Sequence, residues 1–171
     1  NIDVEVRKTY NLSKTHIASR PFCLFISYSG NTEETVSVAK DAINQKLEWA
    51  AISSGGELLE LATKYNKNFI KVPDGLQPRA AFGLMTKAVI NFLPEQIKEV
   101  FIDACEEAGN YLNNLTEDDS SEVFEISKNI ASQIGSKTAV IYAGSELTYL
   151  VAQRWKTQIN ENSKSKAYVG F

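Results

Sequence analysis

The sequence predicts an α/β protein in which parallel sheets are flanked by helices. The first observation is a short, almost continuously apolar segment, Phe22–Tyr28, which has the pattern of a strand buried on both faces. The second is that such segments alternate with amphipathic stretches, which implies right-handed crossovers between parallel strands. The third is the composition: 171 residues with 43% hydrophobic and 23% charged residues can bury a core and are not disordered, coiled-coil or collagen-like.

In the first half of the chain we expect strands and helices in alternation. A polar turn, Ser29–Glu34, separates the first strand from a helix whose apolar residues recur at helical spacing. The elements expected after it are a strand at 49–52, a helix at 57–64, a strand at 69–72, and helices with apolar faces at 81–92 and 97–112. We also expect an earlier strand near residues 2–6.

After a polar, acidic connection at 115–121 the alternation starts again. The expected elements are a capped helix at 123–134, a strand at 138–142, a turn at 143–145, a helix at 147–155 and the start of a strand at 166–171. The two strand–turn–helix units, around Phe22 and around Thr138, predict two related α/β subdomains, at 1–115 and 116–171.

Charge and cysteine usage limit the classes of partner. Lys and Arg total 18, Asp and Glu total 21, and the net charge is −3, which argues against a nucleic-acid partner but not against a small anionic metabolite. No apolar run approaches the ~20 residues of a membrane span, so we expect no membrane partner. Cys23 and Cys105 lie in apolar segments, so we expect reduced core thiols and a cytoplasmic protein.

The densest polar cluster is Ser27–Thr32, at the end of the first strand and the start of a helix. Ligands of open α/β sheets bind beyond the carboxyl ends of the strands, and a helix N-terminus attracts anions. The hydroxyls could converge on a phosphate there, and Gly30 lets the backbone approach it. The alternative is that Asn31 or Thr32 caps the helix. Both interpretations stay open from physics alone, and Glu33 and Glu34 suit a first helical turn in either.

Four short motifs carry a resemblance to a known family. The segment 27–35, Ser-Tyr-Ser-Gly-Asn-Thr-Glu-Glu-Thr, resembles the phosphate-binding loop of sugar isomerase (SIS) domains. Ser-Ser-Gly-Gly-Glu at 53–57 and Gln-Pro-Arg-Ala-Ala-Phe-Gly at 77–83 are similar to one branch, the bifunctional phosphoglucose/phosphomannose isomerases. Asn-Glu-Asn at 160–162 also matches. The resemblance covers essentially the whole chain and implies SIS-type, flavodoxin-like three-layer subdomains.

The resemblance also implies roles for particular residues. Ser27, Ser29 and Thr32 would hold the substrate phosphate, Arg79 would stabilise the enediolate, and Glu161 would move the proton between C1 and C2. These residue types suit the chemistry, because proton abstraction beside a carbonyl needs a positioned base and a fixed positive charge. No metal or other cofactor is needed. The non-catalytic alternatives are that Arg79 has a purely structural role and that Glu161 is a solvated surface residue.

We expect both ends of the chain to be truncated. It begins with Asn1, its only methionine is Met85, and it ends on an apolar run at 167–171. The family has an earlier Gly-Gly-Ser turn that contacts the phosphate and a later ring-opening histidine, and nothing here matches either. His16, the only histidine, precedes the first clear strand and is expected at the surface. We therefore do not expect this chain alone to be active.

The predicted function is isomerisation of glucose 6-phosphate and mannose 6-phosphate to fructose 6-phosphate, with a small sugar phosphate as ligand and a homodimer as the assembly that the family implies. Two rivals stay open. One is the isomerase domain of an amidotransferase that forms glucosamine 6-phosphate, and the other is a non-catalytic sugar-phosphate-binding SIS module. Arg79 and Glu161 together favour the isomerase over the binding module.

Overall fold

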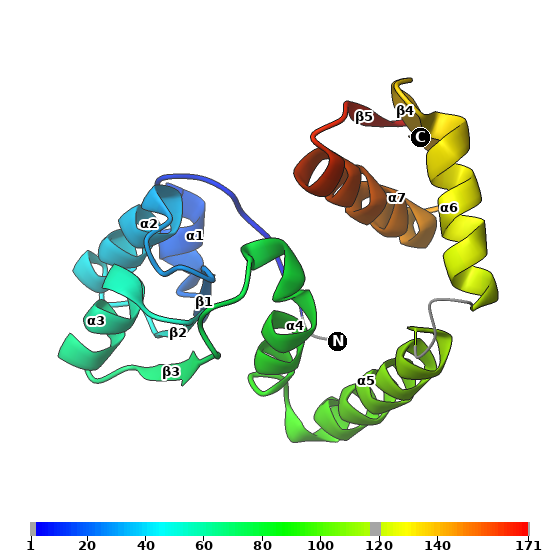
Figure 1. Cartoon of the computed structure of the whole chain (residues 1–171). Coiled ribbons are helices and arrows are strands. Elements are labelled where there is room, and N and C mark those ends of the chain that lie inside the picture. Colours follow the sequence, from blue (N-terminus) through cyan, green and yellow to red (C-terminus); the bar gives the residue numbers. More distant parts are fainter. Residues whose placement is uncertain (1–2, 117–120, 171) are drawn as a thin grey trace. The chain divides into compact units, whose positions relative to one another are not determined.

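The computed structural model describes residues 3–116 and 121–170 (Figure 1). Two compact units divide the chain, Asn1–Ile102 and Asp103–Phe171, and the division falls within helix α5 (Glu95–Thr116). Both units contain parallel strands joined through helices, so the predicted α/β class is confirmed.

The first unit has three layers around a parallel sheet. Strands β1 (Cys23–Ile26), β2 (Trp49–Ser53) and β3 (Asn68–Lys71) pair in that order. Trp49 and Ala51 of β2 pack in a cluster with residues of α2 (Glu33–Asn44) and α3 (Gly56–Lys64). Ile52 of the same strand packs in a second cluster with residues of α4 (Phe82–Ile90). Alternate side chains of the central strand thus serve opposite faces, as the pleat requires.

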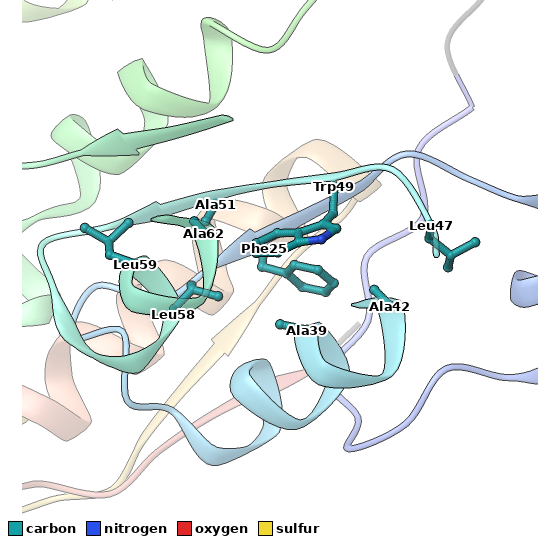
Figure 2. Close-up of a cluster of buried hydrophobic side chains, with 9 residues drawn as sticks. All are labelled: Phe25, Ala39, Ala42, Leu47, Trp49, Ala51, Leu58, Leu59 and Ala62. Atoms are coloured by element: carbon teal, nitrogen blue, oxygen red, sulfur yellow. The ribbon is translucent and has the colours of Figure 1, made fainter. Parts of the chain in front are cut away.

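Figure 2 shows the larger of the two clusters. The rings of Phe25 and Trp49 lie 5.7 Å apart at 59°, a tilted arrangement that aromatic pairs favour. On α2, Ala39 and Ala42 are fully buried, and their small side chains let the helix approach the sheet closely. This core fixes β1 and α2, the two elements that hold the serine-rich turn between them.

The N-terminal segment differs from the sequence prediction. Residues 3–6 form no strand, and Ile2 lies outside the described residues. Val4 is 70% and Val6 80% exposed, so neither has the cover that a buried strand needs. A short helix, α1 (Lys14–Ser19), was not expected; the Ser13 hydroxyl caps it by accepting from the His16 amide.

The second unit contains α6 (Glu122–Ile134), β4 (Ala139–Tyr142), α7 (Glu146–Gln158), a π-helical turn η2 (Ile159–Ser163) and β5 (Ala167–Gly170). The strands β4 and β5 pair in parallel, with Ala139 opposite Ala167. The expected cap on α6 is present, because the Ser121 hydroxyl accepts from the Phe124 amide. Part of the predicted connection, residues 117–120, lies outside the described residues. Over residues 3–116 and 121–170, no helix combines the length and apolarity that crossing a membrane requires.

Candidate functional site

Three loops leave the same edge of the first unit's sheet. Because β1, β2 and β3 are parallel, the segments 27–32, 54–55 and 72–79 all follow the carboxyl ends of their strands. The third loop leads into a 3₁₀ turn, η1 (Pro78–Ala80), which contains Arg79 and comes just before α4. The sequence motifs assigned to phosphate binding and to charge stabilisation therefore lie on one edge of one sheet.

The hydroxyls of the first loop are close together. Ser27 is 5% exposed, and its Oγ lies 2.7 Å from the Oγ1 of Thr32. The Ser27 hydroxyl also accepts from the Gly30 amide at 3.1 Å, which closes the turn. Ser29 is exposed, and its Oγ accepts from the Asn31 amide at 3.2 Å. The turn thus has an exposed hydroxyl at Ser29 and a hydrogen-bonded hydroxyl pair beside it.

The start of α2 has no side-chain cap in the part of the chain that the structure describes. Thr32 occupies the N-cap position with extended backbone, but its side chain makes no capping hydrogen bond. The Asn31 side chain points elsewhere: its Oδ1 accepts from the Glu57 amide of α3 at 3.0 Å. The capping alternative is therefore wrong for α2. The amides of its first turn can receive an anion, helped by the helix dipole.

Two glycines let the first two loops touch. Gly30 has φ +72°, and a Cβ there would overlap the carbonyl oxygen of Gly55. Gly56 has φ +69°, and a Cβ there would overlap the carbonyl oxygen of Ser29 and lie 2.7 Å from Asn31 Oδ1. These contacts need residues without a side chain, in a backbone region that favours glycine. The serine-rich turn at residues 27–32, named the anion turn from here on, is thereby held against the start of α3.

Acidic groups also lie near the α2 N-terminus. Glu33 and Glu34 occupy its first turn, as expected for residues that complement the helix dipole. The negative charge of the Glu34 carboxylate raises the pKa of the exposed Tyr10 phenol, and a hydrogen bond between the two side chains acts in the same direction.

Arg79 and Glu161 lie in different units. Arg79 is half-buried in η1. Glu161 lies in the π-helical turn after α7, exposed, with one carboxylate oxygen 3.7 Å from Lys164 Nζ. Its neighbour Asn160 anchors that turn, because Asn160 Oδ1 accepts from the Ala167 amide of β5 at 2.9 Å. A π-helical turn is rare and often marks a functional position.

Sequence reasoning gave Tyr28 no role and considered Asn31 only as a cap for α2. Asn31 caps α3, and Tyr28 contacts the loop before Arg79. Both residues belong to the serine-rich motif, but the motif does not indicate the distant residues, Glu57 and Pro73, with which their side chains form hydrogen bonds. His16 was expected at the surface but is half-buried, and its Nε2 lies 2.8 Å from Glu5 Oε2. Over residues 3–116 and 121–170 there is no group of three or more His, Cys, Asp or Glu side chains that could hold a metal.

The first unit has three layers around a parallel sheet, and its first strand ends in a serine-rich turn at the start of α2, an arrangement consistent with an SIS-type fold. The comparisons agree with this fold. The family described as "Bacterial phospho-glucose isomerase C-terminal SIS domain" matches residues 125–171, within the second unit. No solved structure matches the chain.

Several curated proteins are similar to most of this chain. A bifunctional phosphoglucose/phosphomannose isomerase of Caldicellulosiruptor bescii is 39% identical over 171 residues, which cover 98% of this chain and 50% of the relative. Its counterpart in Thermoplasma acidophilum is 42% identical over 149 residues, 85% of this chain and 43% of the relative. A D-glucosamine-6-phosphate 4-epimerase of Sulfolobus acidocaldarius is 30% identical over 168 residues, 94% of this chain and 50% of the relative.

The resemblance predicted from the motifs is therefore confirmed: the chain is related to the bifunctional phosphoglucose/phosphomannose isomerases along most of its length. It spans about half the length of the curated relatives that it matches.

Proposed function

We propose that the protein to which this chain belongs interconverts glucose 6-phosphate and mannose 6-phosphate with fructose 6-phosphate through an enediol. One observation carries the proposal: the uncapped N-terminus of α2 adjoins the hydroxyls of Ser27, Ser29 and Thr32. A phosphate there would accept charge-assisted hydrogen bonds from hydroxyls and amides. The names of the relatives support a hexose phosphate as the ligand to which this phosphate group belongs.

The reaction assigns one role to each remaining residue. Glu161 would remove the proton from C2 of the aldose and return it to C1, which a carboxylate base at a fixed position can do. The carbonyl oxygen becomes negative as the enediolate forms, and Arg79, which keeps its charge, would stabilise it. Both epimers lead to the same enediol, and a single base would serve both substrates by reaching the C2 proton of either epimer. Neither step needs a metal ion or a redox cofactor.

The test is turnover of glucose 6-phosphate and mannose 6-phosphate by the full-length protein, before and after Glu161→Gln. The amide keeps the size of the side chain but cannot act as the base. We expect turnover of both sugars to fall together by roughly 10²–10⁴, with phosphate affinity retained. Glu146→Gln is the matched control, because Glu146 is another exposed carboxylate of the second unit, in the first turn of α7.

Three results would count against the proposal. Near-normal turnover by Glu161→Gln would remove this carboxylate from the mechanism. Loss on one sugar alone would mean that the two reactions use different bases. Binding of sugar phosphates without any turnover by the wild type would favour the non-catalytic module.

A second candidate comes from the more distant relative. The Sulfolobus acidocaldarius protein is named as an epimerase of a different sugar 6-phosphate, D-glucosamine 6-phosphate. The same anion turn suits either sugar, since both carry a phosphate. Glucosamine 6-phosphate should therefore be assayed as a third substrate. Conversion of this sugar phosphate alone would contradict the isomerase proposal and support an epimerase.

Assembly and location are also proposals. Exposed apolar side chains on α4 and α5, among them Phe82, Val100 and Phe101, support a homodimer interface. Light scattering of the full-length protein at micromolar concentration should give the mass of a dimer, and a monomer would contradict this. Both cysteines are unpaired thiols, which supports a reducing compartment such as the cytoplasm.

A further inference from the structure

We infer that Tyr28 is a positioning residue that ties the anion turn to the loop carrying Arg79. This inference rests on the proposed function for its catalytic consequence, but the tie itself is a contact between described residues. Tyr28 stands between Ser27 and Ser29, so any residue that it holds is held relative to the anion turn.

The phenol of Tyr28 bridges the two ends of a turn in the third loop. Its hydroxyl donates to the carbonyl oxygen of Pro73 at 3.0 Å and accepts from the amide of Leu76, also at 3.0 Å. Between them stands Gly75, with φ +83° and no atom near the position of a Cβ. The space around the Cβ position of Gly75 is open, and the phenol holds this turn at both of its ends.

The backbone of Tyr28 anchors the second loop at the same time. Its carbonyl oxygen accepts from the Ser54 amide at 2.8 Å and from the Ser54 hydroxyl at 2.7 Å. The buried Ser53 hydroxyl donates to it at 3.1 Å. One residue therefore contacts the loops after β2 and β3 while belonging to the loop after β1.

The aromatic ring of Tyr28 is also held in place, in addition to its hydroxyl group and its backbone carbonyl. It packs on the cluster that contains Ile52, Val72 and Ala88, and Ala88 is in α4. Arg79 lies between the two contacts, after the turn that the phenol bridges and before α4. Tyr28 thus restrains the segment that contains Arg79 at the turn before it and through the cluster that it shares with α4.

The consequence concerns catalysis more than binding. Arg79 must meet the charge that develops on the substrate oxygen, and a displacement of about 1 Å can cost ~10² in rate. The phosphate contacts come from Ser27, Ser29, Thr32 and α2, which the phenol does not hold. Removing the phenol hydroxyl should therefore lower kcat and leave phosphate affinity unchanged.

The test is Tyr28→Phe in the full-length protein, with Tyr65→Phe as the matched control. Tyr65 is another partly exposed tyrosine of the first unit, at the end of α3. We expect Tyr28→Phe to lower kcat about 10-fold or more, while KM, inhibition by inorganic phosphate and the unfolding temperature stay close to wild type. Amide exchange at Leu76 should speed up, because its acceptor is lost. Tyr65→Phe should change none of these.

The outcomes separate this inference from the proposed function. An inactive wild type overturns the isomerase proposal, and faster exchange at Leu76 in Tyr28→Phe would still support the tie. Full kcat in Tyr28→Phe, with an active wild type, overturns the positioning role. Unchanged exchange at Leu76, or equal losses in kcat and in phosphate affinity, overturns it as well.

Discussion

The two strand–turn–helix units of this chain use the same kinds of residue differently. After β4, Ser145 forms a capping box: its hydroxyl accepts from the Thr148 amide at 3.3 Å, and Thr148 Oγ1 accepts from the Ser145 amide at 2.9 Å. After β1, Thr32 stands at the corresponding cap position of α2 and caps nothing there. A turn whose hydroxyls satisfy its own helix has little left for a ligand. The comparison therefore favours the first turn as the anion site.

The units also differ in burial. The first unit buries a cluster of side chains on each face of its sheet. In the second unit, over residues 103–116 and 121–170, the buried hydrophobic side chains are Ala152 and Ala167. Tyr142 and Leu147 are 77% and 74% exposed. A two-stranded sheet is marginal by itself, so the second unit has less to hold it together.

The largest difference should come from the two turn glycines. Gly30→Ala places a Cβ against the carbonyl of Gly55 in a strained backbone region, and we expect a loss of about 4 kcal/mol in stability. Gly144→Ala should change stability by less than about 0.5 kcal/mol, because no atom lies within 4 Å of its Cβ position. Denaturant unfolding measures both. Equal effects would mean that the two turns are packed alike.

Core truncation should show the next largest difference. Leu58 of α3 is fully buried, and Leu58→Ala should cost about 3 kcal/mol. Leu147→Ala should cost less than about 0.5 kcal/mol. Each unit has its own fluorescent reporter, Trp49 in the first and Trp155 in the second. Single-tryptophan variants would therefore follow the two transitions separately, and coincident transitions would show one cooperative body.

The serines should separate ligand binding from helix capping. Ser29→Ala should weaken inorganic phosphate roughly 10-fold or more, since a hydrogen bond to a charged group contributes about 1.5–3 kcal/mol. Ser145→Ala should leave phosphate affinity unchanged and lower the stability of α7 by about 1 kcal/mol. Calorimetric titration and thermal unfolding measure the two effects. A loss of phosphate affinity in Ser145→Ala would indicate that the anion site lies at Ser145 and not at the first turn.

The smallest effect concerns a thiol. Burial raises the pKa of Cys23 at the start of β1, so its thiolate forms at higher pH than that of an ordinary cysteine. The stability this contributes is present below the ordinary thiol pKa and is lost as pH rises through the raised value. In a Cys105→Ser background, alkylation of the folded protein should need a higher pH than alkylation in urea. Identical pH profiles would contradict the burial.

Much of the fold followed from periodicity because strand, turn and helix signals are local. The segment 22–28 was apolar enough to predict β1, and Ser121 predicted the cap of α6. Periodicity failed at residues 3–6, where alternating valines have no neighbouring strand to pair with. Periodicity also could not show which apolar faces are buried in the fold, because burial depends on contacts with other segments of the chain.

The site was predictable in part for the same reason. The hydroxyls of Ser27 and Thr32 lie in one turn, so their proximity followed from the motif. The contact from Asn31 to Glu57 and that from Tyr28 to Leu76 join segments far apart in sequence. Local pattern holds no information about such pairs. Assigning Asn31 to its own helix was reasonable, and only the fold shows that it caps α3 instead.

The paired glycines also limit how this turn can change by mutation. At Gly30 and Gly56 the obstacle to a side chain is backbone of the facing loop, at Gly55 and Ser29. Because no side-chain substitution can move a carbonyl out of the way, a change at either position has no simple compensating partner. In a selection for folded variants, these two positions should accept glycine alone, while Gly144 tolerates many residues. The contact between the two loops thus limits which residues the anion turn can accept at these positions.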